Sequence, residues 1–370
     1  MQGDFSGEWD PAKELPAGFV ELPGKVYSEY PDWIPEVEAV VRYMFSQQNK
    51  YFAVGKVWVG LNDNTRLAGF LAPHQRIEGK LAAFFGYWET KDNPAANKAL
   101  FEAFEEWARD QGAERIYGPI NFSTYGMYRI RLDSFDAGQF IGEPFNPPYY
   151  PGLLEGLGYE LAKMYGTSNI PDLAKAAEKS REYVDSLKQA VESEYVVKLV
   201  TAEYWLDRIE ELYGLTLEIF EENFAYTPIT LDDFRKACGE SFAAKICQHS
   251  SVVAETRDGE IAGMMLCFPD YSALVRQGTR QPIAPETVSF AKHFDSLPDP
   301  RTLLLKTAGV SDRHRGKYLY TYLFNLCVLN ALPYYDKALG CLYVIDNPSR
   351  KTADRMSQDL RHYALYSKEL

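Results

Sequence analysis

Strand-like and helix-like stretches follow one another in the same order in both halves of the chain, and this repetition constrains the fold most. In the first half, residues 51–62 and 80–90 alternate like half-buried strands, and a helical pattern follows. In the second half, the strand-like stretch 301–310 precedes a strongly apolar helical pattern over 317–332. We therefore predict the α/β (α+β) class, with two units that each hold a mixed, twisted sheet flanked by helices.

Local signals fix several element ends. Asn93 is a good N-cap and Pro94 suits the first helical position of the helix that begins there. Thr230 is predicted to cap a second helix, and Asp258-Gly259 to turn a hairpin within 250–270. A last helix is predicted after Asn347.

A charged, helix-prone segment divides the two halves. At 370 residues the chain is long enough for two domains. Residues 171–194 contain only sparse apolar positions, as is typical of a connector. We predict an N-terminal unit over 1–170, a helical connector over 171–194 and a C-terminal unit over 195–370.

Composition and motifs limit the cellular compartment and the partners that we expect for this protein. There is no run of about 18 apolar residues, and acids stand where a signal peptide needs basic residues. The five cysteines include no C-x-x-C pair, which indicates free thiols in a reducing compartment. No metal-binding motif is present. We expect a cytoplasmic protein without a metal, and with neither a membrane nor DNA as partner.

Basic residues gather near the C-terminus. The last 100 residues carry 14 Lys and Arg against 9 Asp and Glu, whereas the whole chain carries 39 against 52. Several lie in GVSDRHRGKYLYTYL (309–323), where a loop opens a helix. Backbone N–H groups and the positive end of a helix bind phosphate in such a loop.

This loop and the order of elements resemble the fold of GNAT (GCN5-related N-acetyltransferase) acyltransferases. Further stretches are similar to tandem-GNAT proteins, which carry one GNAT-like unit in each half. These stretches are YSEYPDWIPEV (27–37), IYGPINFS (116–123), FNPPYYPGLLEGLGYE (145–160), DGEIAGMMLCFPDYS (258–272) and VIDNPSR (344–350).

The resemblance implies acyl transfer by direct attack on a thioester, with the C-terminal unit active. The backbone at Gly309 and Val310 would polarise the carbonyl group. Asn347 and Glu222 are further candidate catalytic residues. Donor phosphate would be bound by Arg313, His314, Arg315, Gly316, Lys317 and Tyr318.

The loop also departs from the family pattern R-G-x-G-x-G. Tyr318 and Tyr320 stand where glycines are expected, and their side chains would crowd a bound pyrophosphate. Either these rings pack the helix and coenzyme A (CoA) binds with adjusted geometry, or another phosphate-bearing donor replaces free CoA. In the N-terminal unit the matching loop, 90–95, has no glycine and carries Asp92, so we predict a scaffold there.

We predict a GNAT-type acyltransferase that moves an acyl group from CoA or a carrier protein onto an amine or hydroxyl of a small metabolite, in specialised metabolism. The acyl-CoA or phosphopantetheine-linked donor is a co-substrate, and no tightly bound cofactor is expected. One alternative is an aminoacyltransferase that uses aminoacyl-tRNA. The other is a non-catalytic GNAT-like binding protein. An open V-shaped cleft beside Val310 would favour catalysis, and a cleft plugged by Tyr318 or Tyr320 would favour the binding protein.

Overall fold

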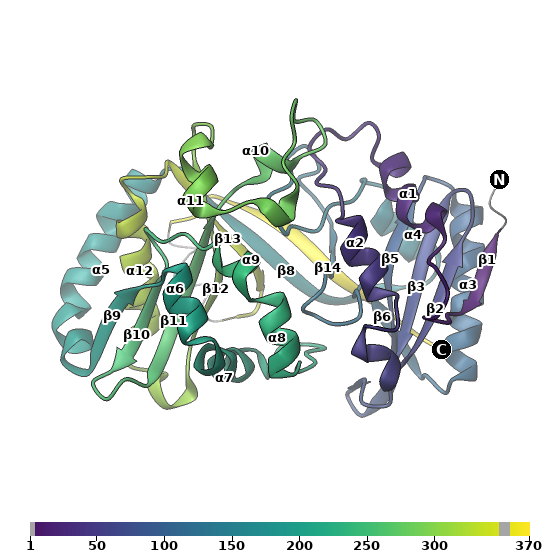
Figure 1. The fold of residues 1–370 in the computed structure, drawn as a ribbon, viewed down its shortest axis with the longest axis horizontal. Coiled ribbons are helices and arrows are strands. Elements are labelled where there is room, and N and C mark those ends of the chain that lie inside the picture. The colour runs from purple at the N-terminus through teal and green to yellow at the C-terminus, as the bar shows by residue number, and fades with distance from the viewer. Residues whose placement is uncertain (1–3, 348–355) are drawn as a thin grey trace. The chain divides into compact units, whose positions relative to one another are not determined.

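The computed structural model describes residues 4–347 and 356–370 and divides into two compact units (Figure 1). Unit 1 comprises Met1–Met164, Val275–Pro282 and His362–Leu370. Unit 2 comprises Tyr165–Leu274 and Ile283–Arg361. Each unit combines a mixed sheet with flanking helices, which confirms the predicted fold class.

The sheet of unit 1 has the strand order β1-β2-β3-β5-β6-β14. Only β5 and β6 run parallel; the other neighbours are antiparallel. The strands are β1 (Phe5–Glu8), β2 (Lys56–Leu61), β3 (Thr65–Leu71), β4 (Arg76–Ile77), β5 (Lys80–Thr90), β6 (Arg115–Gly118), β7 (Ile130–Arg131) and β14 (Asp359–Glu369). The helices are α1 (Ala17–Val26), α2 (Glu38–Met44), α3 (Pro94–Asp110) and α4 (Tyr150–Gly156).

Helix α3 connects the two parallel strands, as such a crossover requires. It begins where predicted, because the Asn93 side chain accepts a hydrogen bond from the N–H of Ala96 and Pro94 occupies the first turn. Its apolar face, which includes Leu100, Phe104 and Trp107, is buried against β2 and β3. This packing forms the core of unit 1.

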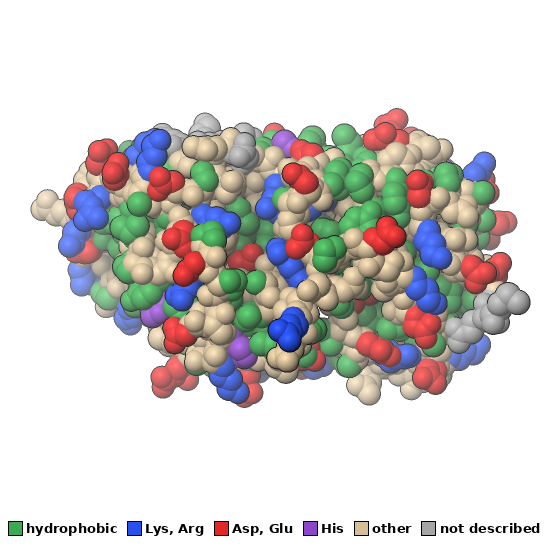
Figure 2. Space-filling model, turned by 90° about the horizontal axis from the view of Figure 1, so that it is seen from above, with side chains coloured by type: hydrophobic (Ala, Val, Ile, Leu, Met, Phe, Trp, Pro, Cys, Tyr) green, Lys and Arg blue, Asp and Glu red, His purple; other side chains and the backbone are tan. Residues whose placement is uncertain are grey.

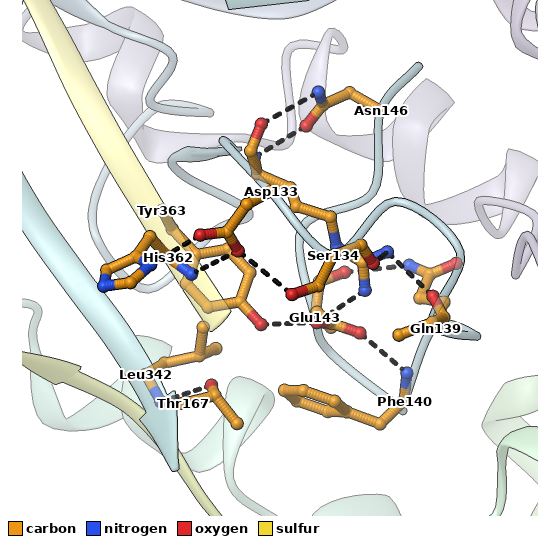
Figure 3. A network of polar contacts seen from close by, with 12 residues as sticks. Asp133, Ser134, Gln139, Phe140, Glu143, Asn146, Thr167, Leu342, His362 and Tyr363 are labelled. Atoms are coloured by element: carbon orange, nitrogen blue, oxygen red, sulfur yellow. Dashed lines mark hydrogen bonds and ion pairs between the residues drawn. The ribbon is translucent and has the colours of Figure 1, made fainter. Parts of the chain in front are cut away.

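A buried polar network fastens the C-terminal strand β14 into unit 1 (Figure 3). The Arg131 guanidinium lies 2.7 Å from the Glu143 carboxylate, and both side chains are fully buried. The Tyr363 hydroxyl of β14 donates to the same carboxylate. Beside them, His362 Nδ1 lies 2.5 Å from the Asp133 carboxylate. Because each buried charge has a partner of opposite charge or a phenol, the network can remain inside the protein.

The sheet of unit 2 has the strand order β8-β13-β12-β11-β10-β9. Here only β12 and β13 run parallel. The strands are β8 (Glu160–Ile170), β9 (Tyr195–Leu199), β10 (Val252–Thr256), β11 (Ile261–Pro269), β12 (Thr302–Val310) and β13 (Lys337–Val344). The helices are α5 (Leu173–Glu194), α6 (Ala202–Asp207), α7 (Ile209–Phe220), α8 (Leu231–Ala237), α9 (Glu240–Ala243), α10 (Ser272–Val275), α11 (Phe290–His293) and α12 (Leu319–Ala331).

Helices cover both faces of this sheet (Figure 1). Helix α12 packs on β10, β11 and β12 from one face, with α5 beside it. Helix α7 packs on β11 and β12 from the other face. The predicted cap of α8 is present, because Thr230 Oγ1 accepts a hydrogen bond from the N–H of Asp233. The predicted hairpin turn is present as well, with Gly259 at a φ of +94°.

The unit boundaries differ from the predicted 1–170, 171–194 and 195–370. The segment expected to be a connector forms α5, which packs on α12 inside unit 2. Strand β8 starts in unit 1 and continues into unit 2, and β14 returns the chain to unit 1. There β14 pairs with β6, with Tyr366 opposite Gly118, so that β6 is not left as an open edge. Strand pairing between segments far apart in sequence thus sets the boundaries.

Three chemical features follow from the described residues. None of their helices is long and apolar enough to span a membrane. No group of three or more His, Cys, Asp or Glu residues among them could hold a metal ion. All five cysteines are free thiols, and four of them are buried. The helix predicted after Asn347 falls mainly on residues 348–355, outside the described part of the chain.

Candidate functional site

The two parallel strands of unit 2 pair only along their first halves. Thr302–Leu305 of β12 pairs with Lys337–Gly340 of β13. On its other edge β13 pairs with β8 both before and after Gly340, with Ala338 opposite Ile170 and Tyr343 opposite Gly166. In the described residues, the second half of β12 has ladder pairs with β11 alone. The ladder between the two strands therefore ends before Val310, at the place where an open cleft would favour catalysis.

The N–H of Val310 points towards the side from which β13 has separated. Val310 lies opposite Gly263 of β11, and the next residue, Ser311, donates its N–H to the carbonyl of Ala262 at 2.9 Å. Hydrogen-bonded and non-hydrogen-bonded pairs alternate along an antiparallel ladder, so Val310 belongs to a non-hydrogen-bonded pair. Its N–H faces away from β11 and is available to an acceptor on that side.

Gly309, the other predicted backbone residue, has a packing role. It faces helix α7, and a Cβ atom at this position would lie 2.5 Å from side-chain carbons of Ile219. The N–H of Gly309 belongs to a hydrogen-bonded pair with β11 by the same alternation. Of the two predicted residues, Val310 is therefore the one whose N–H can polarise a carbonyl group.

The basic loop follows directly after β12. It contains a 3-10 turn over Asp312–His314, and Gly316 has a φ of +77°. Tyr318 precedes α12 in a left-handed conformation with a φ of +60°. Its side chain is 68% exposed, so the ring is not buried between the strands. Tyr320, the other tyrosine expected to crowd the loop, is partly buried.

Carboxylates already surround the cations of this loop. The Arg315 guanidinium lies 2.8 Å from Asp312, and that of Arg313 lies 3.3 Å from Glu260. Lys317 lies 2.7 Å from Glu194, and the hydrogen bond between them raises the pKa of Lys317.

A carboxylate also occupies a backbone N–H of the loop that a phosphate would otherwise bind: the N–H of Asp312 donates to the Glu218 carboxylate at 2.5 Å. On the face shown in Figure 2, basic and acidic side chains are likewise interspersed. Exposed ion pairs of this kind contribute only about 0–1 kcal/mol, so a phosphate could exchange with the carboxylates.

The remaining predicted residues lie on separate elements. The His314 ring accepts from or donates to the Tyr195 hydroxyl at 2.9 Å. Glu222 is exposed in the turn after α7, two residues beyond the end of that helix. Asn347 is exposed after β13, and its N–H donates to the carbonyl of Val344. The loop residues follow Val310 directly in the chain, whereas Glu222 follows α7 and Asn347 follows β13.

Unit 1 differs from unit 2 at the corresponding strand end. After β6, the chain stays beside β5: Ile120 donates its N–H to the carbonyl of Phe85 at 2.6 Å. The N–H of Tyr87 donates to the Asn121 side chain at 2.7 Å. Segment 119–121 thus occupies the side of β5 that stays open beside β12 in unit 2. The loop after β5 contains the Asn93 cap, which uses a helix N–H that a phosphate would otherwise bind.

The end of β5 also carries a polar cluster that the sequence analysis did not identify. The Glu89 carboxylate accepts hydrogen bonds from the hydroxyls of Tyr27 at 2.6 Å and Tyr150 at 2.8 Å. Buried Arg66 lies 4.0 Å from Glu89 and 2.7 Å from Glu36. The one signal in the sequence is a glutamate near the end of an otherwise apolar strand, KLAAFFGYWET.

Comparison with known proteins gives the fold a name. No protein-family model matches the chain. The chain is 25% identical over 272 residues to a bacterial ceramide synthase from Caulobacter vibrioides. This match covers 70% of this chain and 68% of that protein. It is 22% identical over 233 residues to Protein YghO from Escherichia coli, a match that spans 56% of that protein's length and 58% of this chain.

Among solved structures, a tandem GNAT protein from the clavulanic acid biosynthesis pathway is similar over 99% of this chain and 98% of its own, with a TM-score of 0.52 and 13% identity. Its likeness extends across both units, and each unit here has the mixed sheet and crossover helix described above. The expected architecture is therefore confirmed: the chain has a tandem GNAT-like fold.

Proposed function

We propose that this protein transfers an acyl group from a thioester donor to an amine, and that unit 2 carries out the reaction. The observation that carries the proposal is the separation of β12 and β13 beside Val310, with the Val310 N–H facing the open side. Unit 1 lacks this opening, since Ile120 and Asn121 bind along β5. Because β5 in unit 1 has no such opening, we infer that unit 1 does not bind the donor and serves as a scaffold, as predicted.

The chemistry requires few side chains. The amine nitrogen attacks the thioester carbonyl, the C–N bond forms, and the C–S bond breaks as the thiol leaves with a proton. Negative charge develops on the carbonyl oxygen during attack, and a backbone N–H stabilises that charge without reorganisation. The Val310 N–H is oriented for this role. Holding amine and thioester together supplies much of the remaining rate enhancement.

Donor phosphate is assigned to Arg313, Arg315 and Lys317, with Gly316 and the start of α12 beside them. CoA and a phosphopantetheine arm both supply this phosphate, so either thioester suits the loop. The exposed Tyr318 ring and the carboxylates beside each cation favour a donor held by a few phosphate contacts.

The acceptor class comes from a relative. A ceramide is an N-acylated amino alcohol, and the Caulobacter relative is named a bacterial ceramide synthase. We therefore favour an amine over a hydroxyl as the acceptor, with an amino alcohol as the first compound to test. Reaction in the cytoplasm would keep the five free thiols reduced.

The test is a donor and acceptor screen with matched variants. The full chain is incubated with acyl-CoA or acyl-carrier protein and with sphinganine, ethanolamine or serine, and both free thiol and amide product are quantified. Val310→Pro removes the N–H, whereas Val310→Ala keeps it. We expect Val310→Pro to abolish turnover and Val310→Ala to retain it, with thermal unfolding checking that both variants fold.

The other outcomes separate the alternatives. Amide formation with aminoacyl-tRNA but with neither thioester would overturn the proposed donor class. Tight donor binding without turnover for any acceptor would favour the non-catalytic binding protein. Equal activity of the two Val310 variants would refute the role of the backbone N–H.

A further inference from the structure

The end of β5 in unit 1 holds a carboxylate with one oxygen fixed and the other open. Both phenol hydrogen bonds, from Tyr27 and Tyr150, reach Oε2 of Glu89. Oε1 lies 4.0 Å from Arg66 Nη2 and accepts no hydrogen bond from the described residues. The Glu89 side chain is 17% exposed, so a ligand can reach it from solvent.

The charges around Glu89 do not balance when both glutamates are ionised. Among the described residues Arg66 is the only cation in the cluster, and its nearer partner is Glu36 at 2.7 Å. Its Nε atom is buried without a hydrogen-bond partner among the described residues. A cationic ligand would therefore balance the negative charge of the cluster.

Aromatic side chains hold the cluster in position. Tyr27 stacks on Trp33 with ring centres 4.7 Å apart, and Tyr150 contacts Tyr149 at 5.3 Å. The Tyr149 hydroxyl donates to the carbonyl of Thr90, at the very end of β5. Aromatic faces beside carboxylates attract organic cations. The carboxylate at the centre of the cluster thus suits an ammonium group better than an anion.

The protonation of Glu89 responds to its surroundings. Burial raises the pKa of Glu89 to about 7; Arg66 and the two phenol hydrogen bonds oppose this shift, and Glu36 adds to it. Near neutral pH a fraction of the protein therefore carries a neutral Glu89. An arriving cation would favour the carboxylate and release that proton. The charged and titratable groups that face Glu89 are Tyr27, Glu36, Arg66, Tyr149 and Tyr150.

We propose that the end of β5 in unit 1 is a binding site for a small organic amine, whose ammonium group contacts Glu89 Oε1. This site lies in the unit that the proposed function treats as a scaffold, so the inference goes beyond the acyl-transfer reaction of unit 2.

Calorimetric titration with ethanolamine tests the site. Measurements at pH 7 in phosphate and in MOPS, which differ in their heat of ionisation, give the number of protons released. We expect binding with release of about half a proton per ligand, because Glu89 is near its midpoint there. Ethylene glycol, which lacks the ammonium group, should not bind.

Variants identify the group responsible. Glu89→Gln should weaken ethanolamine binding about 10- to 100-fold and abolish proton release, since a charge-assisted contact is lost. Glu36→Gln should weaken binding while proton release persists. The matched control is Glu155→Gln, whose exposed carboxylate accepts a hydrogen bond from Tyr366 elsewhere in unit 1. This control should bind like the wild type.

The result that overturns the site is the absence of ethanolamine binding to the wild type, or equal binding to Glu89→Gln. Equal proton release by wild type and Glu89→Gln would also refute it. The readout is binding and not turnover, so Val310→Pro should leave it unchanged. Failure of this proposal is thereby distinguishable from failure of the acyl-transfer proposal.

Discussion

Ile219 of α7 packs so closely on the backbone of Gly309 in β12 that a Cβ atom at position 309 would lie 2.5 Å from its side-chain carbons. The helix and the strand end next to Val310 are thereby fixed against each other. Gly309→Ala should lower the free energy of unfolding by about 1–3 kcal/mol through overpacking. Urea unfolding measures this change.

The double variant Gly309→Ala/Ile219→Ala identifies the cause. Removing the Ile219 side chain makes room for the new methyl group. The double variant should therefore lose at least about 1 kcal/mol less unfolding free energy than the sum of the losses in the two single variants. Gly214→Ala on the same helix is the control, because a Cβ there meets nothing within 4 Å and should stabilise the helix. Additive effects at 309 and 219 would contradict the contact.

Asp312 competes with donor phosphate for Arg315. The two side chains lie 2.8 Å apart and are 64% and 49% exposed, so their pairing contributes at most about 1 kcal/mol. Asp312→Asn should strengthen donor use up to about 5-fold, whereas Arg315→Ala should weaken it about 10- to 150-fold. The KM for each thioester donor, determined at low and high salt, reports both effects.

Glu210→Gln is the control for that series, since Glu210 pairs with Arg235 between α7 and α8. It removes one exposed negative charge from unit 2 but leaves the basic loop unaltered. If Asp312→Asn and Glu210→Gln changed KM equally, general charge rather than the Arg315 pair would be responsible.

Tyr318 occupies a left-handed backbone conformation that glycine adopts more easily. Its φ is +60°, and its ring is 68% exposed, so replacement removes little packing. Tyr318→Gly should be more stable than Tyr318→Ala by about 1 kcal/mol, because only glycine avoids the Cβ contact. Denaturant unfolding of the two variants gives this difference directly.

The same pair of variants tests whether the Tyr318 ring limits CoA binding. Both lack the ring, so both should bind CoA more tightly than the wild type in a calorimetric titration. Unchanged affinity would mean that the ring leaves the phosphate site clear, and acyl-CoA would then become the first donor to consider.

Signals that act over a few residues predicted the fold well. Asn93, Thr230 and Gly259 each fix an element end through a hydrogen bond or φ value set by near neighbours. The helical nature of 173–194 was predicted for the same reason. Its place within unit 2 was not, because packing on α12 depends on residues more than a hundred positions away.

Contacts between residues far apart in the chain also explain which parts of the candidate sites could not be predicted from the sequence. The phenols that bind Glu89 come from positions 62 residues before it and 61 after it, and no spacing rule relates them. The carboxylates beside Arg313 and Lys317 are also distant in the chain: Glu260 lies 53 residues from Arg313, and Glu194 lies 123 residues from Lys317. A basic run can be read from the sequence; the acids that neutralise it in the fold cannot.

Glu89 should make the stability of unit 1 depend on pH in an unusual direction. Its pKa in the folded protein is raised to about 7 from the ordinary value of 4.5. Between these values the folded state binds the proton more tightly than the unfolded state does. The free energy of unfolding therefore falls as the pH rises from about 4.5 to about 7, by about 3 kcal/mol for this group.

Glu89→Gln isolates this contribution. The glutamine carbonyl can still accept the hydrogen bonds of Tyr27 and Tyr150, but it carries no charge at any pH, so the fall in stability over this range should be smaller by the same amount. Above pH 7 the variant should consequently be more stable than the wild type, although the proposed binding of an amine would be lost. Urea unfolding at half-unit steps of pH gives both curves, with Glu155→Gln as the control that keeps the wild-type slope. Parallel curves for the wild type and Glu89→Gln would mean that the Glu89 carboxylate titrates at its ordinary value, and that water or Arg66 compensates its charge in the folded protein.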